Sequence, residues 1–320
     1  MTDNKPTYPY RFERHQIAEW KAYLAEHGFV VVADALSPEQ NQQVVDEMLD
    51  VLCELSDGKL DKQKPKTWSV AKNYPFMLHG GMIQYVGHAG FQWTTRVATA
   101  PIFADIWEVK PEELATSFDG FTYMDARRKY QPKETNSFLH SDQSPTKDFL
   151  WSIQGLVNLF DCDEESGGLV VLPGSHKWHQ AYFVEKGLQA LKEDWYVVSE
   201  EDKKEERFQP ILKVCGKAGD MMLWDSRTFH CNCLPKNGKR RGCVYVCQIP
   251  KQRISPQICT KRRQAWEEKR TTNHYPGNDI KLFPRLPRYA EPELASFVPA
   301  VSLQTLDTTQ QKLAYLQPNT

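Results

Sequence analysis

Residues 219–230 read GDMMLWDSRTFH. The stretch contains an apolar run of four residues at 221–224 and ends in a histidine, His230. Turn-forming residues bound the run, which is typical of a short buried strand. Similar runs lie on both sides of it along the chain, at 120–124, 149–160, 169–172 and 242–249. Many short strands separated by turns are typical of a jelly roll or barrel. We therefore expect a mainly β fold whose core spans about residues 118–250, with helices on its flanks.

The regions outside this core have helical patterns. Ile17, Trp20 and Leu24 recur at helical spacing, and Ser37-Pro38-Glu39-Gln40 has the residues of an N-cap, a first-turn proline and a capping box. No linker marks a boundary, so we expect one domain over residues 1–320. We also expect a buried strand at 29–32, short helices at 101–109 and 261–270, and a Pro-rich tail after residue 278 that wraps the surface.

Composition restricts the class of partner. The 320 residues include 40 basic and 41 acidic ones, a net charge of -1, whereas proteins that bind nucleic acid usually carry a basic excess. The eight cysteines form no CxxC pair, the N-terminus does not resemble a signal peptide, and no apolar run reaches membrane-spanning length. We therefore expect a cytoplasmic protein with a small-molecule substrate and neither a nucleic acid nor a membrane partner; the sequence does not indicate an oligomeric state.

His140-Ser141-Asp142 is the most informative short motif. Alternate side chains of a strand point to the same face, so His140 and Asp142 would converge on one point. His230, which follows the strand at 221–224, is the best third ligand. Two histidines and a carboxylate are the facial triad of non-haem Fe(II) oxygenases. HxD alone recurs by chance, often as a surface pair, so this interpretation depends on the motifs that follow.

A metal-chelating 2-oxoglutarate would need a cation for its far carboxylate, and an arginine fork suits that group. Arg241 lies eleven residues after His230, beyond an Asn237-Gly238 hairpin signal. If 237–238 is the turn of a hairpin, Arg241 shares a sheet face with His230 at an offset of roughly 13 Å. Arg240 would point the other way, and Arg241 itself could be a surface cation.

The sequence resembles the phytanoyl-CoA dioxygenase family over roughly residues 118–250. The resemblance rests on HSDQS at 140–144, GGLVVLPGSHK at 167–177, GDMMLWDSRTFH at 219–230, and Arg241. It implies a double-stranded β-helix (a cupin-like jelly roll), Fe(II) held by the catalytic residues His140, Asp142 and His230, and 2-oxoglutarate held by Arg241. It also implies O2 as oxidant, with decarboxylation of 2-oxoglutarate to succinate coupled to hydroxylation of the substrate.

Gln154, Asn158 and Trp224 lie near these motifs and are candidate contacts to the oxoacid. The flanking stretches 80–85, 117–120 and 154–159 resemble an uncharacterised branch of the family, which leaves the substrate open. Related halogenases have a small residue at the carboxylate position. Asp142 occupies that position here, which favours hydroxylation.

Candidate substrate contacts lie outside the core motifs: Trp68, Gln84, Tyr85 and Arg127. Each of the four could equally be a packing or surface residue. Two further clusters could bind metal, His176 with His179 and Cys231 with Cys233, but neither has a complete ligand set. The alternatives to a small-molecule oxygenase are a non-catalytic sensor or scaffold that binds the metal and 2-oxoglutarate, and a protein hydroxylase.

Overall fold

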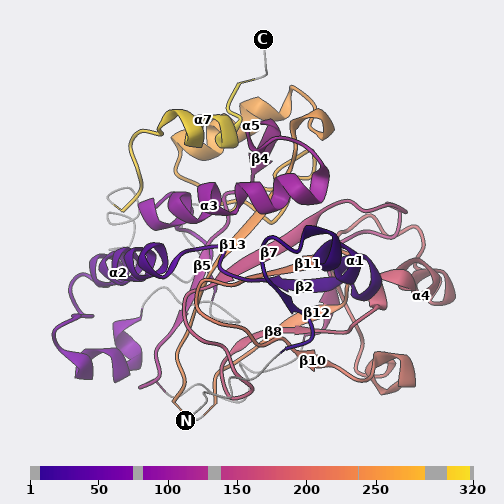
Figure 1. The fold of residues 1–320 in the computed structure, drawn as a ribbon, viewed down its shortest axis with the longest axis horizontal. Helices are drawn as coiled ribbons and strands as arrows, with labels where there is room; N and C mark the ends of the chain where they lie inside the picture. The colour runs from indigo at the N-terminus through magenta and orange to yellow at the C-terminus, as the bar shows by residue number, and fades with distance from the viewer. Residues whose placement is uncertain (1–7, 75–81, 129–137, 237, 285–300, 318–320) are drawn as a thin grey trace.

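Two facing β-sheets with helices on their outer sides form the architecture (Figure 1). The computed structural model describes residues 8–74, 82–128, 138–236, 238–284 and 301–317. Within these residues every strand pair is antiparallel except β1 with β2. The predicted fold class, a mainly β double-stranded β-helix with flanking helices, is confirmed.

The larger sheet has the order β1-β2-β11-β7-β13-β5-β3, with β4 beside β13. Its strands are β1 (Arg11–Phe12), β2 (Phe29–Val32), β3 (Met82–Ile83), β4 (Leu114–Thr116), β5 (Phe121–Met124), β7 (Ile153–Asn158), β11 (Met221–Asp225) and β13 (Arg241–Pro250). The smaller sheet has the order β10-β8-β12-β6-β9. Its strands are β6 (His140–Ser141), β8 (Gly168–Val171), β9 (Tyr196–Val197), β10 (Leu212–Lys213) and β12 (His230–Cys233).

Six α-helices are described, and most of them cover the larger sheet. They are α1 (Ile17–His27), α2 (Pro38–Leu55), α3 (Gly90–Trp107), α4 (His179–Glu185), α5 (Ile258–Glu267) and α7 (Thr308–Ala314). Figure 1 shows α3 across the outer side of the larger sheet, with α7 and α5 beyond it and α2 beside it, while α4 lies at the opposite end of the molecule.

Alternation along the strands separates the interior between the sheets from the interior under the helices. On β11, Met221 and Leu223 join the apolar cluster under the helices, whereas Met222 and Trp224 point between the sheets. A register shift of one residue would exchange these faces. Burial of each such side chain contributes about 1.5–3 kcal/mol, so the pattern fixes the register of the strand.

The N-terminal part enters the larger sheet as well as flanking it. The capping box predicted at Ser37 is present, with Gln40 N donating to Ser37 Oγ at 3.2 Å and Ser37 N donating to Gln40 Oε1 at 3.0 Å. The strand predicted at 29–32 is β2, which pairs with β11. The β core therefore begins well before residue 118.

The short helix predicted at 101–109 is wrong in its start, because α3 begins at Gly90 and Pro101 lies inside it. Residues buried on α3 include Phe91, Trp93 and Arg96 as well as Ile102, so they occupy more than one face. A helix buried on most sides lacks the single apolar stripe by which a sequence pattern is recognised.

The described part of the tail after residue 278 packs into the molecule instead of wrapping its surface. Its described part contributes Leu306 and Leu313 to the main apolar cluster. Residues 285–300 lie outside the described residues. The helix predicted at 261–270 is α5, shifted by three residues toward the N-terminus.

Arg262 of α5 joins three separate segments. Its fully buried guanidinium donates to the carbonyls of Ala314 at 2.7 and 2.9 Å, Pro276 at 2.5 Å and Thr116 at 2.6 Å. A charged donor that satisfies several buried carbonyls is costly to remove, because the acceptors are then left without partners.

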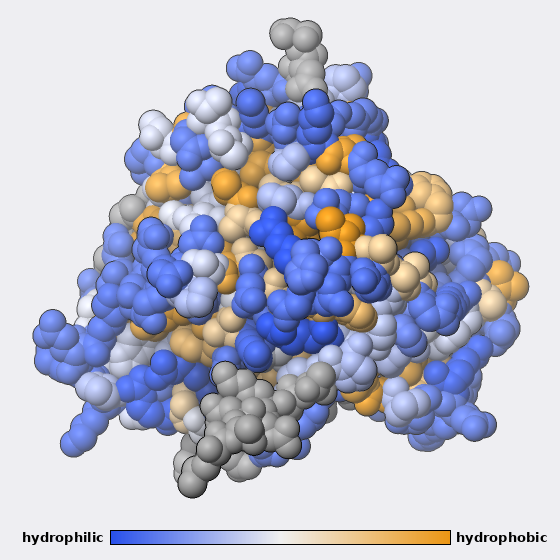
Figure 2. All heavy atoms as spheres, viewed as in Figure 1, coloured by the Kyte–Doolittle hydropathy of each residue, from blue (hydrophilic) through white to orange (hydrophobic). Residues whose placement is uncertain are grey.

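The face shown in Figure 2 is largely hydrophilic, with hydrophobic residues scattered among polar ones. Most large apolar side chains are buried in the clusters described above. Among the described helices, none is both long enough and apolar enough to cross a bilayer.

Replacing Arg262 tests its role in joining these segments. Arg262→Leu should lower the free energy of unfolding by about 3 kcal/mol, because it strands buried carbonyls. The matched control is Arg263→Leu. The Arg263 side chain is exposed and, among the described residues, bonds only Leu316 O, so its loss should change stability little. Equal denaturation midpoints for the two variants would contradict this assignment.

Candidate active site

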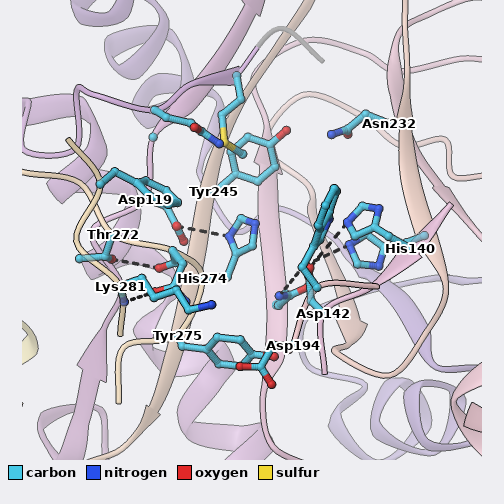
Figure 3. Close-up of a pocket in the computed structure, with 18 of the residues that line it drawn as sticks. Asp119, His140, Asp142, Asp194, Asn232, Tyr245, Thr272, His274, Tyr275 and Lys281 are labelled. Atoms are coloured by element: carbon cyan, nitrogen blue, oxygen red, sulfur yellow. Dashed lines mark hydrogen bonds and ion pairs between the residues drawn. The ribbon is translucent and has the colours of Figure 1, made fainter. Parts of the chain in front are cut away.

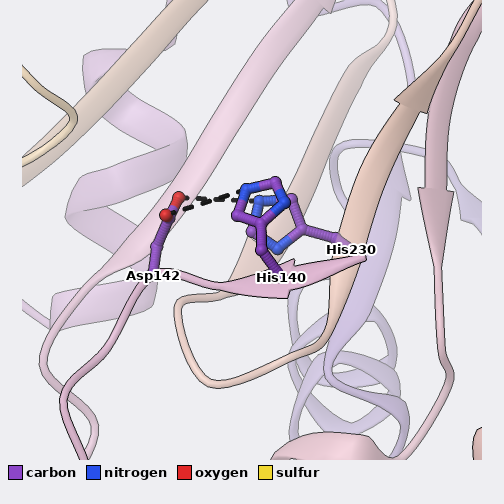
Figure 4. A group of neighbouring side chains, drawn as sticks. All are labelled: His140, Asp142 and His230. Carbon is purple, nitrogen blue, oxygen red and sulfur yellow. Dashed lines mark ion pairs between the residues drawn. The ribbon is translucent and has the colours of Figure 1, made fainter. Parts of the chain in front are cut away.

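Three side chains meet at one end of the space between the sheets (Figure 4). His140 on β6 and His230 on β12 are direct partners in the antiparallel register, and Asp142 follows β6 by one residue. The Nε2 atoms of His140 and His230 lie 3.7 and 3.6 Å from the two oxygens of Asp142. One ligand atom from each residue falls within 4.8 Å of the others, so the group can hold a metal ion.

Alternation along β6 separates the ligands from their neighbour. Ser141 points to the opposite side, where its hydroxyl lies 3.3 Å from Nε2 of His179. His140 and Asp142 therefore share a face, as predicted. Among the described residues, no other group of three His, Cys, Asp or Glu side chains meets in this way.

Each histidine has a fixed tautomer. Nδ1 of His140 lies 2.8 Å from the carbonyl of Phe138, and Nδ1 of His230 lies 2.9 Å from the carbonyl of Thr228. A carbonyl only accepts, so each Nδ1 is the donor, and each Nε2 faces the carboxylate of Asp142. This is the usual arrangement of metal-binding histidines, in which the second ring nitrogen donates to the protein.

Burial sets the charge states of the ligands. Burial and the neighbouring His230 lower the pKa of His140 to about 4, so its ring is neutral at neutral pH. Burial raises the pKa of Asp142, but the two imidazoles outweigh it and hold that pKa below its usual value. His140 is therefore a neutral donor and Asp142 an anion, the protonation states that a metal ligand set requires.

Gln154 orients the carboxylate of Asp142. It lies on β7, and its Nε2 donates to Asp142 Oδ2 at 3.0 Å. Gln154 lines the cavity, and its buried Oε1 has no partner among the described residues. The structure shows Gln154 holding the carboxylate of a predicted metal ligand, and its contact to the oxoacid stays a prediction.

Arg241 lies behind the cavity wall as a buried cation. Its side chain donates to Asn232 Oδ1 at 2.6 Å and more weakly to Cys233 O and Tyr245 Oη, both at 3.4 Å. No carboxylate of the described residues lies within salt-bridge distance of it. A buried guanidinium without an anion is costly, so this position favours an anionic ligand.

The predicted hairpin between the strand of His230 and the strand of Arg241 is wrong, although Arg241 is buried in the molecule. β12 pairs with β6 and β8, whereas β13 pairs with β4, β5 and β7, so the two strands lie in different sheets. A backbone bond joins Lys239 N to Lys236 O, but the chain then crosses between sheets; Asn237 lies outside the described residues. The guanidinium of Arg241 bonds Asn232, which lies two residues after His230 on β12. Two residues of a strand span about 7 Å, so the guanidinium lies roughly that far along β12 from His230.

Gly167 makes room for this arginine. A Cβ at Gly167 would lie 2.8 Å from Pro235 N and 3.0 Å from Arg241 Cδ. The glycine pair noted in the sequence therefore permits close approach of the chain that carries the cation.

The other two candidate oxoacid contacts differ in position. Trp224 lines the cavity, its ring lies 5.2 Å from that of His230, and its buried Nε1 has no partner in the described part of the chain. Asn158 lies deeper on β7, opposite Cys243, with its amide against Met222 Sδ at 3.9 Å. It is not part of the described cavity wall.

Of the four candidate substrate contacts, Gln84 lines the cavity. The structure does not bring the others there. Trp68 is buried against Tyr123 and donates to Asp61 O, and Tyr85 is buried in the core under the helices. Arg127 forms a bidentate pair with Asp125 at 2.6 Å. Their aromatic or charged character is used in packing and pairing.

A cavity of about 550 Å³ opens from the metal ligands toward the C-terminal segment (Figure 3). Much of its far wall comes from residues that the sequence did not single out: Asp119, Thr272, Asn273, His274, Tyr275 and Lys281. His274 contacts Asp119, 155 positions earlier in the chain, so no local pattern could have revealed the pair.

The alternative metal clusters are accounted for by other contacts. His176 Nε2 lies 3.0 Å from Ala25 O, and His179 packs beside Ser141. Cys231 is buried in the apolar cluster beside α4, and Cys233 ends β12 with its Sγ 4.0 Å from Ser166 O.

Comparison with known proteins agrees with this geometry. The family model described as phytanoyl-CoA dioxygenase (PhyH) matches residues 125–232, which include all three metal-ligand candidates. This part of the chain is therefore similar to the phytanoyl-CoA dioxygenase family. The match ends before Arg241 and before the C-terminal wall of the cavity, so the structure alone places those residues.

One curated relative covers most of the chain. It is Ava biosynthesis cluster protein O of Aspergillus versicolor, 27% identical over 275 residues, covering 82% of this chain and 87% of the relative. Two solved structures share the fold. A hypothetical protein of Escherichia coli has a TM-score of 0.61 at 15% identity, covering 95% of this chain and 84% of its own. A putative oxidoreductase of Salmonella typhimurium LT2 has a TM-score of 0.55 at 15% identity, covering 89% and 85%.

The PhyH-family match and the His-Asp-His triad together support an oxygenase, and they agree with the expected cofactors, Fe(II) and 2-oxoglutarate.

Removing the amide of Gln154 tests its hold on Asp142. Gln154→Leu should weaken metal binding by about 10-fold or more, because a free carboxylate loses its fixed orientation. The matched control is Gln42→Leu, an exposed amide on a carboxylate, Asp46 Oδ1 at 3.0 Å. Titration with Mn(II) gives both dissociation constants, and unchanged binding by Gln154→Leu would remove this role.

Proposed function

We propose that the protein is an Fe(II)- and 2-oxoglutarate-dependent dioxygenase that hydroxylates a small organic substrate. The observation that carries the proposal is the meeting of His140, Asp142 and His230 with both Nε2 atoms turned to the carboxylate. Two histidines and one carboxylate leave further positions of a metal open for a co-substrate and dioxygen. 2-Oxoglutarate would be decarboxylated to succinate.

The residues present fit both absent groups. The donor set of two imidazoles and one carboxylate suits a first-row divalent metal. Arg241 is a buried cation without a carboxylate partner among the described residues, and the polar atoms of Asn232 and Tyr245 surround it. A diacid chelated at the metal by one end would place its other carboxylate there.

Each side chain then has a separate task. His140, Asp142 and His230 hold the metal, Gln154 keeps the carboxylate oriented, and Arg241 fixes the far end of the diacid. Bound Fe(II), with O2 and 2-oxoglutarate, supplies the oxidising chemistry. The apolar cluster between the sheets limits the water around the site, because Leu169 and Trp224 line the cavity and belong to that cluster.

Hydroxylation is favoured over halogenation because Asp142 occupies the position that a halide would need. The cavity volume lies in the range of small-molecule sites. The name of the Aspergillus relative, a biosynthesis cluster protein, also supports a small organic substrate.

Asp142→Ala tests the metal centre. With Fe(II), 2-oxoglutarate and a pool of metabolites, succinate formation should fall at least about 100-fold, because the only anionic ligand of the triad is lost. Asp50→Ala, an exposed aspartate on α2 paired with Lys62, is the control. Equal turnover in wild type and Asp142→Ala would end the proposal. Binding of 2-oxoglutarate without any consumption would instead indicate a non-catalytic sensor.

Arg241→Met tests the oxoacid anchor. The concentration of 2-oxoglutarate for half-maximal binding should rise about 10- to 100-fold, since a charge-assisted bidentate bond is lost. Arg240→Met is the matched control, because the exposed Arg240 points away and covers the ring of Phe160 at 5.2 Å. Anaerobic titration of the metal-loaded protein measures both, and equal shifts would contradict the assignment.

A further inference from the structure

The cavity has a second polar group on the wall that faces the metal ligands. Chain segment 272–283 forms this wall and is held at both ends. Thr272 N donates to Phe118 O at 3.1 Å, and Phe283 N donates to Thr271 O at 3.0 Å. Lys281 N donates to Asn273 Oδ1 at 2.8 Å, which closes the segment on itself. The side chains that it presents therefore have fixed positions.

His274 is the central side chain of this wall. Its Nδ1 lies 3.3 Å from Oδ1 of Asp119, whose side chain is almost fully buried. The other oxygen of Asp119 accepts a hydrogen bond from Ser117 Oγ at 2.6 Å, so the carboxylate is itself oriented. Figure 3 shows His274 between Asp119 and Asp142.

The second nitrogen of His274 remains available. Its Nε2 has no hydrogen-bond partner within the described ranges, and the side chain keeps 26% of its surface exposed. Burial lowers the pKa of His274, but Asp119 outweighs it and raises that pKa to about 9. The ring is therefore protonated at neutral pH, and Nε2 presents a charged donor to the cavity.

Among the described residues that line the rest of the cavity, the acidic side chains have partners, whereas one basic side chain has none. Asp194 is paired with Lys147 at 2.6 Å, and Asp142 belongs to the metal site. Asp119 is paired with His274. Lys281 lines the cavity, is exposed, and has no carboxylate within salt-bridge distance in the described part of the chain. The wall therefore offers two donors with positive charge and no unpaired acid.

The remaining lining is apolar and aromatic. Met82, Trp195 and Phe283 lie on it, and Trp195 is 59% exposed, a large value for a tryptophan. Exposed large aromatic surface beside a cavity is typical of a binding site. A ligand that fits both parts has an apolar body and one anionic group.

We propose that His274, oriented by Asp119, and Lys281 recognise a carboxylate on the substrate, while Met82, Trp195 and Phe283 hold its hydrocarbon or aromatic body. The inference rests on the proposed function, because this wall would position the substrate opposite the metal. Arg241 takes no part, since it holds the co-substrate.

Binding of paired probes tests this recognition. Protein loaded with Mn(II) and saturating 2-oxoglutarate, which occupies Arg241, is titrated with 3-phenylpropionate, 4-phenylbutyrate and benzoate and with the neutral amide of each. Tryptophan fluorescence reports binding, because Trp195 and Trp224 line the cavity. At least one carboxylate should bind about tenfold or more tightly than its amide. Failure of every carboxylate to bind better than its amide, or to bind at all, would overturn the proposal.

The variants assign the preference to residues. His274→Gln and Lys281→Met should each reduce the ratio of carboxylate to amide affinity by about tenfold. The matched control His15→Gln, an exposed histidine elsewhere, should leave it unchanged. Lys281 is exposed, so Lys281→Met remains decisive if His274→Gln fails to fold. An unchanged ratio in Lys281→Met would count against the site.

Asp119→Asn tests the positioning role separately, because it keeps the shape and removes the charge that orients His274. It should reduce the same ratio while leaving binding of the amides unchanged. Probe binding requires no turnover, so it separates the two proposals. A carboxylate preference without succinate formation would support this site and contradict the proposed function. Succinate formation without the preference would support the proposed function and contradict this site.

Discussion

The direct pairing of His140 with His230 across β6 and β12 is the constraint on which the site depends. It brings two side chains that are 90 positions apart into ring contact at 4.3 Å between centroids. β6 has only two residues, so few bonds of its own hold it. Its place is secured from outside by Ser226 O, which accepts from Asp142 N, and by β9 on its other edge. The ligand geometry is thus a property of the assembled sheets and not of one motif.

The same two sheets separate the tasks of the site. The smaller sheet carries the three candidate metal ligands: His140 on β6, His230 on β12, and Asp142 directly after β6. The larger sheet supplies Gln154 and Trp224 beside the ligands and Arg241 at the far end. Distances within the site therefore depend on the packing between sheets, where Leu156, Trp224 and Tyr245 meet Leu169 and Val171. A mutation in that cluster would change the separation of metal and guanidinium without touching either.

Sequence patterns predicted what depends on local order. Alternation placed His140 and Asp142 on one face, the apolar run at 221–224 became β11, and the capping residues at Ser37 began α2 where expected. Arg241 is buried beside Asn232, and its role as the oxoacid anchor stays a prediction. The hairpin used to place it is wrong, because a turn signal at 237–238 does not determine which strands pair afterwards.

What the sequence did not reveal depends on contacts between distant segments. The two-residue strands β6, β9 and β10 are too short to show a period. Trp68 and Arg127 have the character of ligand contacts, but nearby partners use them for packing and pairing. His274 and Asp119 come from distant parts of the chain, and only the folded chain brings them together at the cavity.

The backbone bond between Phe283 and Thr271 closes the last cavity wall into a loop, and side-chain contacts from Arg262 and Asp119 hold its middle. Its length and side chains can change without altering any strand pairing, and it lies beyond the segment that matches the family model. Natural variation could therefore remodel one side of the chamber while the ferrous chemistry stays intact, and exchange of this loop between relatives is a practical route to chimeras with new selectivity.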